Sequence, residues 1–155
     1  MSRARLLAVV TMDLLERLRM RDWRLSAQRR AVAEVLAGDH VHLTAEQVHE
    51  RARDLVPEIS RATVYSTLNE LVAMGDLTVV DTVQGPKRYD PNVANAHDHF
   101  VCDRCGTIRD IPRAAARAAR HRCLADGSLV DRVDVTYHGL CPSCARLHEE
   151  PDPDA

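Results

Sequence analysis

The stretch His97-Asp-His-Phe-Val-Cys-Asp-Arg-Cys105 decides how the second half of this chain folds. It ends in a Cys-x-x-Cys pair, and a second such pair, Cys141 and Cys144, lies near the end of the chain. Each pair presents two sulfurs on the same side of a turn, so four thiolates can surround one Zn²⁺ tetrahedrally. The alternatives are two disulfides or inert buried thiols. The spacing therefore predicts a structural zinc site formed by Cys102, Cys105, Cys141 and Cys144.

Two histidines precede the first cysteine pair, with one residue between them. On a β-strand, residues two positions apart point to the same face, so His97 and His99 can present two nitrogens to one ligand. Because the four cysteines already complete the zinc site, these two imidazoles are available to bind a different ligand. The alternative is that each histidine is an ordinary satisfied polar residue. We predict a second metal site here.

Composition and charge favour a cytoplasmic protein. The chain has 155 residues, which suggests one domain or two small ones. The formal net charge is −2, so no overall positive field indicates nucleic acid, although arginines outnumber acids within residues 1–30. No apolar run reaches membrane-spanning length and no signal-peptide pattern is found. We therefore expect no membrane partner, and reduced cysteines that are available to metal.

Several features outside the motifs keep their alternatives open. The fifth cysteine, Cys123, is expected to be a buried inert thiol, with a redox role as the alternative, and His121 could join an accessory site. Residues 1–12 look like an extension, so either Met1 or Met12 can be the start. Residues 149–155 are acidic and contain proline, and we expect a disordered tail.

The first half of the chain is predicted to form helices followed by a hairpin. An amphipathic helix is expected from about residue 12, and Ser26, Thr44 and Ser60 are typical N-caps of helices that run to about residues 37, 55 and 74. An alternating stretch at 77–83, a turn at 84–86 and a returning strand at 87–89 predict a β-hairpin. This order is typical of a winged helix-turn-helix.

The second half is predicted to contain more strand than helix. Strands are expected at about 98–102, 107–111 and 129–138, with a helix at roughly 113–124. A unit this small buries little apolar surface, so we expect it to need zinc and a partner chain. The whole chain is therefore predicted as α+β: a winged-helix domain at 1–89, a hinge at 90–96 and a small α/β dimerisation domain at 97–148.

The helix that begins at Arg61 is the one that a winged helix-turn-helix places in the major groove. Its outward positions are polar, small or aromatic, which suits base edges and phosphate oxygens. The alternative is an ordinary solvated face, with Tyr65 capping the helix packing. The predicted DNA contacts are Arg61, Ala62, Thr63, Tyr65, Ser66 and Asn69 on this helix, Arg24 and Arg29 before it, and Lys87 and Arg88 on the wing.

In this order the motifs resemble the ferric uptake regulator (Fur) family of metal-dependent repressors. The resemblance runs from about Leu14 to Cys144. It rests on Trp-Arg-Leu-Ser-Ala-Gln-Arg at 23–29, Ile-Ser-Arg-Ala-Thr-Val-Tyr at 59–65, the stretch at 97–106 and the closing cysteine pair. It implies a homodimer that binds a double-stranded DNA operator at an inverted repeat.

Within this family, the chain is most similar to the peroxide-sensing regulators, whose sensing site uses three histidines and two aspartates. Carried over residue by residue, that site falls on His42, Asp90, His97, His99 and Asp110. The resemblance implies Fe²⁺ or Mn²⁺ in this site. It further implies that hydrogen peroxide oxidises His42 or His97 of the iron form, that the metal is lost and that the DNA is released. Mn²⁺ lacks this chemistry.

Three other functions are weighed against peroxide sensing. An iron- or manganese-responsive repressor would share the fold and lose its metal reversibly. A zinc hydrolase or deaminase needs an open zinc position and a general base, but four thiolates close the zinc and no His-Glu-x-x-His occurs, so we expect no enzyme. The third alternative is a protein-interaction module that zinc stabilises, but the arginine-rich start and the wing argue against it.

Overall fold

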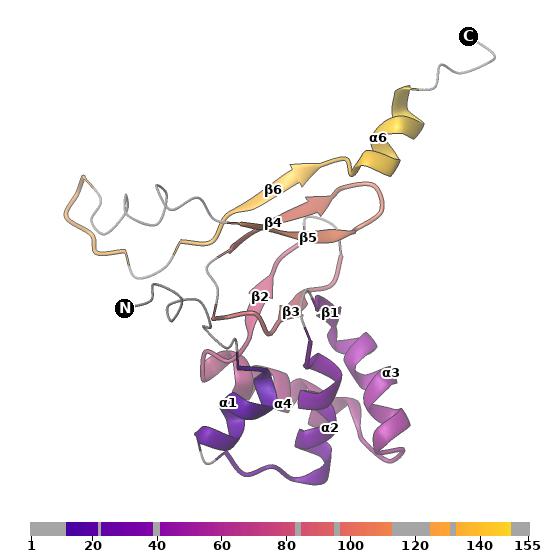
Figure 1. Ribbon diagram of the computed structural model, residues 1–155, viewed down its shortest axis with the longest axis vertical. Helices are drawn as coiled ribbons and strands as arrows, with labels where there is room; N and C mark the ends of the chain where they lie inside the picture. Colours follow the sequence, from indigo (N-terminus) through magenta and orange to yellow (C-terminus); the bar gives the residue numbers. More distant parts are fainter. Residues whose placement is uncertain are drawn as a thin grey trace, which may run out of the picture. The chain divides into compact units, whose positions relative to one another are not determined.

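The structure is a computed structural model. It describes residues 12–21, 23–38, 41–82, 85–94, 97–112, 125–130 and 133–149. These residues belong to two compact units, one made of the chain up to Val79 together with Arg88–Ala94, and one made of Val80–Lys87 together with residues 95–155 (Figure 1). Among the described helices, none has the length and apolar character needed to cross a bilayer.

Four helices of the first unit begin at side-chain caps. They are α1 (Leu14–Met20), α2 (Ala27–Leu36), α3 (Ala45–Leu55) and α4 (Arg61–Ala73) (Figure 1). The caps are Asp13, Ser26, Thr44 and Ser60, and each side chain accepts a hydrogen bond from the backbone N–H three residues further on. Each cap thereby satisfies one of the N–H groups that a helix start leaves without a partner. The predicted caps Ser26, Thr44 and Ser60 are confirmed, whereas Asp13 was not predicted, and because it is the cap of α1 this helix begins two residues later than expected.

The apolar faces of these helices pack into one core. Leu18, Val32, Leu36, Val48, Val64, Leu68 and Leu71 are completely buried in it. On α4, Val72 is only half-buried, whereas the polar Thr67 is buried. The Thr67 hydroxyl donates to the Thr63 carbonyl at 2.8 Å, and this bond makes a buried threonine acceptable.

A three-stranded sheet completes this part of the fold. Its strands are β1 (Leu43–Thr44), β2 (Thr78–Val80) and β3 (Arg88–Asp90), in the order β1-β3-β2. The predicted hairpin is present with shorter strands. Strand β1 was not predicted, because two residues are too few to show an alternating pattern. Asp90, expected to begin the hinge, is instead the last residue of β3.

The second unit contains a mixed sheet and a helix. The strands are β4 (His97–Cys102), β5 (Ile108–Pro112) and β6 (Thr136–Gly139), in the order β5-β4-β6, and α6 (Pro142–Glu149) follows. Strand β5 is antiparallel to β4, whereas β6 is parallel to it. Helices and sheets in both units confirm the predicted α+β class.

Three predictions for the second unit need correction or lie outside the described residues. The strand expected at 129–138 begins only at Thr136, and 133–135 are not in a strand. Helix α6 was missed, although Pro142 at its first position is a typical helix-start signal, and Glu149 belongs to this helix rather than to the tail. The helix predicted at 113–124, with His121 and Cys123, and the tail at 150–155 lie outside the described residues.

Candidate metal centres and DNA-binding surface

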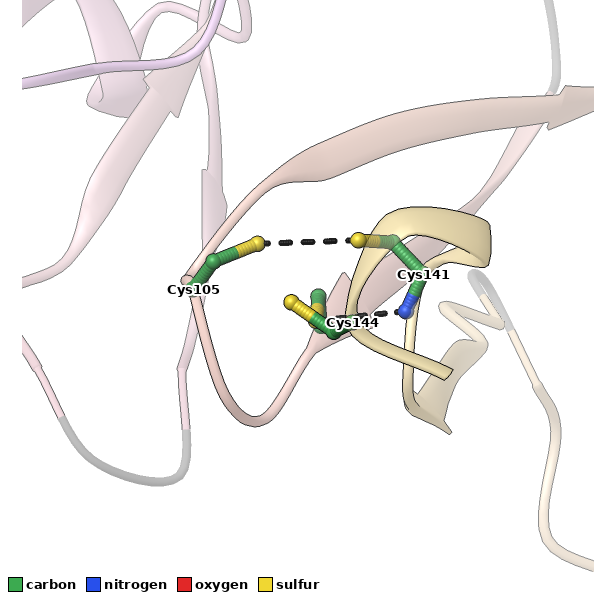
Figure 2. Close-up of side chains that lie close together, drawn as sticks. Cys105, Cys141 and Cys144 are labelled. Carbon is green, nitrogen blue, oxygen red and sulfur yellow. Dashed lines mark hydrogen bonds between the residues drawn. The ribbon is translucent and has the colours of Figure 1, made fainter. Parts of the chain in front are cut away.

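Two turns of the second unit bring four cysteines together. Cys102 ends β4, Cys105 lies in the turn that follows, Cys141 immediately precedes α6, and Cys144 lies in its first turn. Figure 2 shows the sulfurs of Cys105, Cys141 and Cys144 directed toward one another. The four Sγ atoms lie within 4.8 Å of one another, and the four side chains are thiols rather than two disulfides. The predicted four-cysteine cluster is therefore confirmed.

Backbone hydrogen bonds hold the two cysteine turns in place. In the first turn, the N–H of Gly106 donates to the Cys102 carbonyl at 2.8 Å, and Gly106 has a φ of +69° that this tight turn favours. The second turn is joined to the first because the Cys141 N–H donates to the Cys102 sulfur at 3.2 Å. This bond is one of the dashed lines in Figure 2.

The electrostatics of the cluster favour a cation at its centre. The hydrogen bond from the Cys141 N–H is the largest cause that lowers the pKa of Cys102 to about 6. The Thr107 hydroxyl, 3.1 Å from the Cys105 sulfur, lowers the pKa of Cys105. The neighbouring Cys141 thiol, followed by burial, raises the pKa of Cys144 to about 12. The first thiolates are thus favoured and the last is opposed by its neighbours, so a thiophilic divalent cation fits this donor set.

A second group of donors lies at the start of β4. His97 and His99 face the same side of the strand, and their Nε2 atoms are 3.1 Å apart. Asp110 lies directly opposite His99 on β5, and its Oδ1 is 3.8 Å from His97 Nε2 and 4.0 Å from His99 Nε2. All three side chains are largely buried, with exposed fractions of 10, 12 and 6 %. Side chains alternate along β4, which puts both histidines on the same face of the strand. The pairing of β5 with β4 then places the Asp110 carboxylate beside them.

A third group lies in the first unit, where β1 meets β3. Leu43 pairs with Tyr89 in an antiparallel ladder, so His42 and Asp90 face each other next to this pair. His42 Nε2 lies 4.0 Å from Asp90 Oδ2, and the two side chains are 6 and 0 % exposed. Arg88 donates to the His42 carbonyl at 3.1 Å, and the Asn92 N–H donates to Asp90 Oδ1 at 2.8 Å. The unpredicted strand β1 is therefore what positions His42.

The five predicted regulatory ligands come from both units, two from the first and three from the second. Imidazole nitrogens and carboxylate oxygens are donors that suit Fe²⁺, Mn²⁺ and Zn²⁺. The chemistry of both groups fits a divalent metal.

The outward face of α4 is exposed as the sequence analysis expected. Arg61, Ala62, Tyr65, Ser66 and Asn69 are exposed, and Thr63 is half-buried with its hydroxyl 2.9 Å from Ser60 Oγ. An open groove of about 360 Å³ runs between the starts of α2 and α4. It is lined by Ser26, Gln28, Arg29, Ala62, Thr63, Ser66 and Thr67.

Arg29, one of the predicted DNA contacts, has several partners within the protein. Its guanidinium forms an ion pair with Glu70 of α4, and its Cζ lies 4.7 Å from the centre of the Trp23 ring. The Trp23 Nε1–H donates to the same carboxylate at 2.7 Å. Sequence reasoning missed Glu70, because nothing in the pattern of α4 indicates which helix its carboxylate will meet.

The other predicted basic contacts differ in their surroundings. Arg61 lies 3.3 Å from Glu46 with most of its side chain exposed. Arg88 is half-buried, and besides the His42 carbonyl it approaches Gln47 Oε1 at 3.3 Å. Arg24 and Lys87 are exposed.

Comparison with known proteins supports one family throughout. The sequence model of the ferric uptake regulator family matches residues 20–138. The transcriptional regulator FurA of Mycobacterium tuberculosis (strain H37Rv) is 35 % identical over 137 residues, which are 86 % of this chain and 90 % of that protein. The peroxide-responsive repressor PerR of Staphylococcus aureus (strain NCTC 8325) is 29 % identical over 136 residues, which are 82 and 86 %.

A solved structure shows the same fold. The Helicobacter pylori ferric uptake regulator aligns with a TM-score of 0.68 and 24 % identity, covering 90 % of this chain and 94 % of that one. The family match spans more than half of the chain and includes both the predicted recognition helix and the first cysteine pair. The chain therefore belongs to the ferric uptake regulator family of metal-responsive transcriptional regulators and is not an enzyme.

Proposed function

We propose that this protein is a DNA-binding repressor that senses hydrogen peroxide through an Fe²⁺ or Mn²⁺ site and thereby derepresses oxidative-stress genes. The observation that carries the proposal is the donor set: three histidines with two aspartates. One unit supplies His97, His99 and Asp110 as neighbours, and the other supplies His42 and Asp90. Three nitrogens and two carboxylates suit Fe²⁺ or Mn²⁺.

The chain's own residues would convert metal binding into DNA binding. Ligands from both units that share one ion would hold the two parts of the chain at a set spacing. In a homodimer, this spacing fixes the distance between two α4 helices, and half-sites about one helical turn apart require a fixed distance. The metal then acts as a ligand that favours one of two arrangements.

The peroxide response would damage the ligands themselves. Fe²⁺ held by these ligands would supply the redox chemistry that cleaves the O–O bond of hydrogen peroxide. Hydrogen peroxide is the two-electron oxidant: one of its oxygen atoms would be added to the imidazole ring of His42 or His97 in place of a ring hydrogen, and the other would leave as water. The oxidised ring would then bind the metal less well. The arrangement that binds DNA is then no longer favoured.

The remaining assignments complete this proposal. Cys102, Cys105, Cys141 and Cys144 hold one structural Zn²⁺ per subunit. Residues 1–89 and Asp90 at the end of β3 form the DNA-binding domain, 91–96 the hinge and 97–148 the dimerisation domain, and the homodimer acts on an inverted-repeat operator in the cytoplasm. The DNA-facing residues are Arg61, Ala62, Thr63, Tyr65, Ser66 and Asn69, with Arg24, Lys87 and Arg88 beside them. Arg29 lies next to this surface, paired with Glu70 and stacked on Trp23.

A second candidate is an iron- or manganese-responsive repressor that does not sense peroxide. It is favoured by the description of the matching family, the ferric uptake regulators, which refers to iron and not to peroxide. Both candidates use the same ligands and the same DNA surface. They differ only in what happens to the histidines when peroxide is present.

The deciding experiment loads the zinc-containing protein anaerobically with Fe²⁺ or Mn²⁺ and measures its binding to its own promoter fragment. Near-stoichiometric hydrogen peroxide is then added. We expect release of the iron form only, with one oxygen atom added to the peptide that contains His42 or His97. A His138→Gln variant is the control, because His138 pairs with Asp103 outside the ligand set and should leave the response unchanged.

The other outcomes decide between the candidates. If both metal forms stay bound after peroxide and are released by a chelator, the protein is a metal-responsive repressor and oxidation is not its mechanism. If no metal changes binding to the promoter, the repressor proposal itself fails.

A further inference from the structure

A single guanidinium, that of Arg17 on α1, joins distant segments of the first unit. Its Nε donates to Asp76 Oδ1 at 3.2 Å, and its Nη2 donates to the Asp76 carbonyl at 3.0 Å and to the Pro91 carbonyl at 2.9 Å. Its Nη1 donates to the Met12 carbonyl at 3.1 Å. Arg17 is 16 % exposed and the Asp76 side chain is completely buried. Breaking such a pair from one side is strongly destabilising, because a buried charge then loses its partner.

Asp76 is part of the structure that ends the recognition helix. After α4, Gly75 adopts a φ of +75° and its N–H donates to the Val72 carbonyl at 3.0 Å, while the Asp76 N–H donates to the Leu71 carbonyl at 2.9 Å, which also accepts from the Leu77 N–H at 3.3 Å. This is the hydrogen-bonding pattern of a glycine-terminated helix end. Whatever holds Asp76 in place therefore also holds the C-terminal end of α4.

Pro91 directly follows Asp90, the candidate metal ligand at the end of β3. The Asp90 carboxylate accepts from the Asn92 N–H at 2.8 Å, and the Pro91 carbonyl also accepts from the Val93 N–H at 2.9 Å. The proline ring fixes φ at this point of the chain. A change in the position of Asp90 therefore moves the carbonyl that Arg17 binds.

We propose that Arg17 is a positioning residue that couples the metal site at Asp90 to the recognition helix α4. It binds the segment after Asp90 with the same terminal nitrogen that binds the main chain of Asp76. When Asp90 donates to a metal, the Pro91 carbonyl is held and Arg17 keeps the end of α4 in the orientation that binds DNA. When that ligand is released, Arg17 loses one of its acceptors and α4 is held less firmly. This inference rests on the proposed metal-dependent DNA binding.

Arg21 provides a matched comparison on the same helix. It lies 3.5 Å from Asp76 Oδ2 and donates to the Met74 carbonyl at 2.9 Å, so it also contacts the end of α4. The contacts described for Arg21 do not include Pro91, whereas those of Arg17 do. The two arginines therefore share the aspartate and differ in the connection to the metal ligand.

The test is a thermodynamic cycle with Mn²⁺, which avoids oxidation. The affinity for a promoter fragment is measured with and without Mn²⁺ for the full-length dimer, for Arg17→Lys and for Arg21→Lys. Lysine keeps the charge but presents a single ammonium group that cannot reach all of the acceptors at once. We expect Arg17→Lys to reduce the Mn²⁺-dependent increase in DNA affinity by about tenfold, within the usual range of coupling between sites, and Arg21→Lys to preserve it.

Each outcome of the cycle has one meaning. If Arg17→Lys weakens DNA binding by the same factor with and without Mn²⁺, Arg17 has only a structural role and the inference is overturned. The inference is also overturned if Arg21→Lys loses as much of the Mn²⁺ effect as Arg17→Lys does. If the unmodified protein shows no Mn²⁺ effect, the proposed function fails instead.

A second measurement on the unmodified protein does not depend on whether the variants fold. Hydrogen exchange at the amides of Asp76 and Leu77 should slow when Mn²⁺ binds, because the end of α4 is then held more firmly. The amide of Val56, which donates to the Ala52 carbonyl at the end of α3, is the comparison and should change less. Equal slowing of all three amides, or no slowing at Asp76 and Leu77, would also overturn the inference.

Discussion

Each of the two units of this protein is stabilised internally by a different kind of core. The first has a conventional apolar core in which leucines and valines from four helices are buried, among them Leu18, Leu36 and Leu68. In the second, the described buried cluster consists of Cys102, Cys141 and Cys144 with Phe100 packed against it. One unit buries hydrocarbon and the other buries sulfur that can bind metal.

This difference indicates which part of the chain depends on metal for its fold. Burying a leucine or valine side chain contributes about 1.5–3 kcal/mol whether or not metal is present. Buried thiols contribute much less by packing alone, but as ligands they make the free energy of metal binding part of the free energy of folding. We therefore expect the first unit to fold without metal and the second to require it.

The largest effect should come from removing one cysteine ligand. Cys102→Ser should abolish tight zinc binding and unfold β4–β6, since structural zinc sites contribute on the order of 10 kcal/mol. Hydrogen exchange followed by mass spectrometry should show lost protection in 97–112 and 133–149, with protection in α2–α4 retained. Cys123→Ser is the control and should keep its zinc. If β4–β6 stayed protected in metal-free Cys102→Ser, the second unit would not require metal to fold.

A smaller effect, limited to the other unit, should come from the apolar core. Leu68→Ala removes a fully buried side chain of α4 and should lower the free energy of unfolding by about 2–5 kcal/mol without loss of zinc. Trp23 is the only tryptophan, so its fluorescence reports denaturant unfolding of this unit. Leu55→Ala, at a side chain that is 51 % exposed, should change little. Loss of zinc from Leu68→Ala would show that the two units do not fold separately.

The smallest effect on stability should come from the polar connection between α2 and α4. Arg29 and Glu70 are each about one-third exposed, so Arg29→Gln should cost no more than about 1 kcal/mol. Because Arg29 is already bound by Glu70 and Trp23, we expect the salt dependence of DNA binding to be unchanged. Arg24→Gln, at an exposed arginine, should instead reduce the slope of log K against log salt by about 0.9. An equal reduction in Arg29→Gln would show that Arg29 contacts a phosphate, as the sequence predicts.

The parts of the fold that could be predicted are those with a local cause. Ser26, Thr44 and Ser60 each bond a backbone N–H three residues away, so neighbouring residues are sufficient to identify the helix starts. Strand β1 and helix α6 were missed for different reasons. The first is too short for any periodic signal, and the first turn of the second contains Cys144, whose spacing from Cys141 indicates a metal-binding turn more strongly than a helix.

The candidate sites follow the same division. The four cysteines and the pair His97 and His99 could be predicted from spacing alone. Asp110 was suggested only by resemblance, and the reason it meets the histidines is the register that sets it opposite His99. Likewise, only the pairing of β1 with β3 explains why the buried Asp90 carboxylate faces His42.

The helix caps, the cysteine turns and the common face of the two histidines therefore follow from local sequence, because each depends on geometry within about four residues. Which distant groups meet depends on tertiary packing: Asp110 with the histidines, Glu70 with Arg29, and Asp76 with Arg17, which lies 59 residues earlier in the chain. Such contacts depend on how helices pack and how strands align. Those arrangements result from burying the whole apolar surface together, and no short stretch of sequence contains that information.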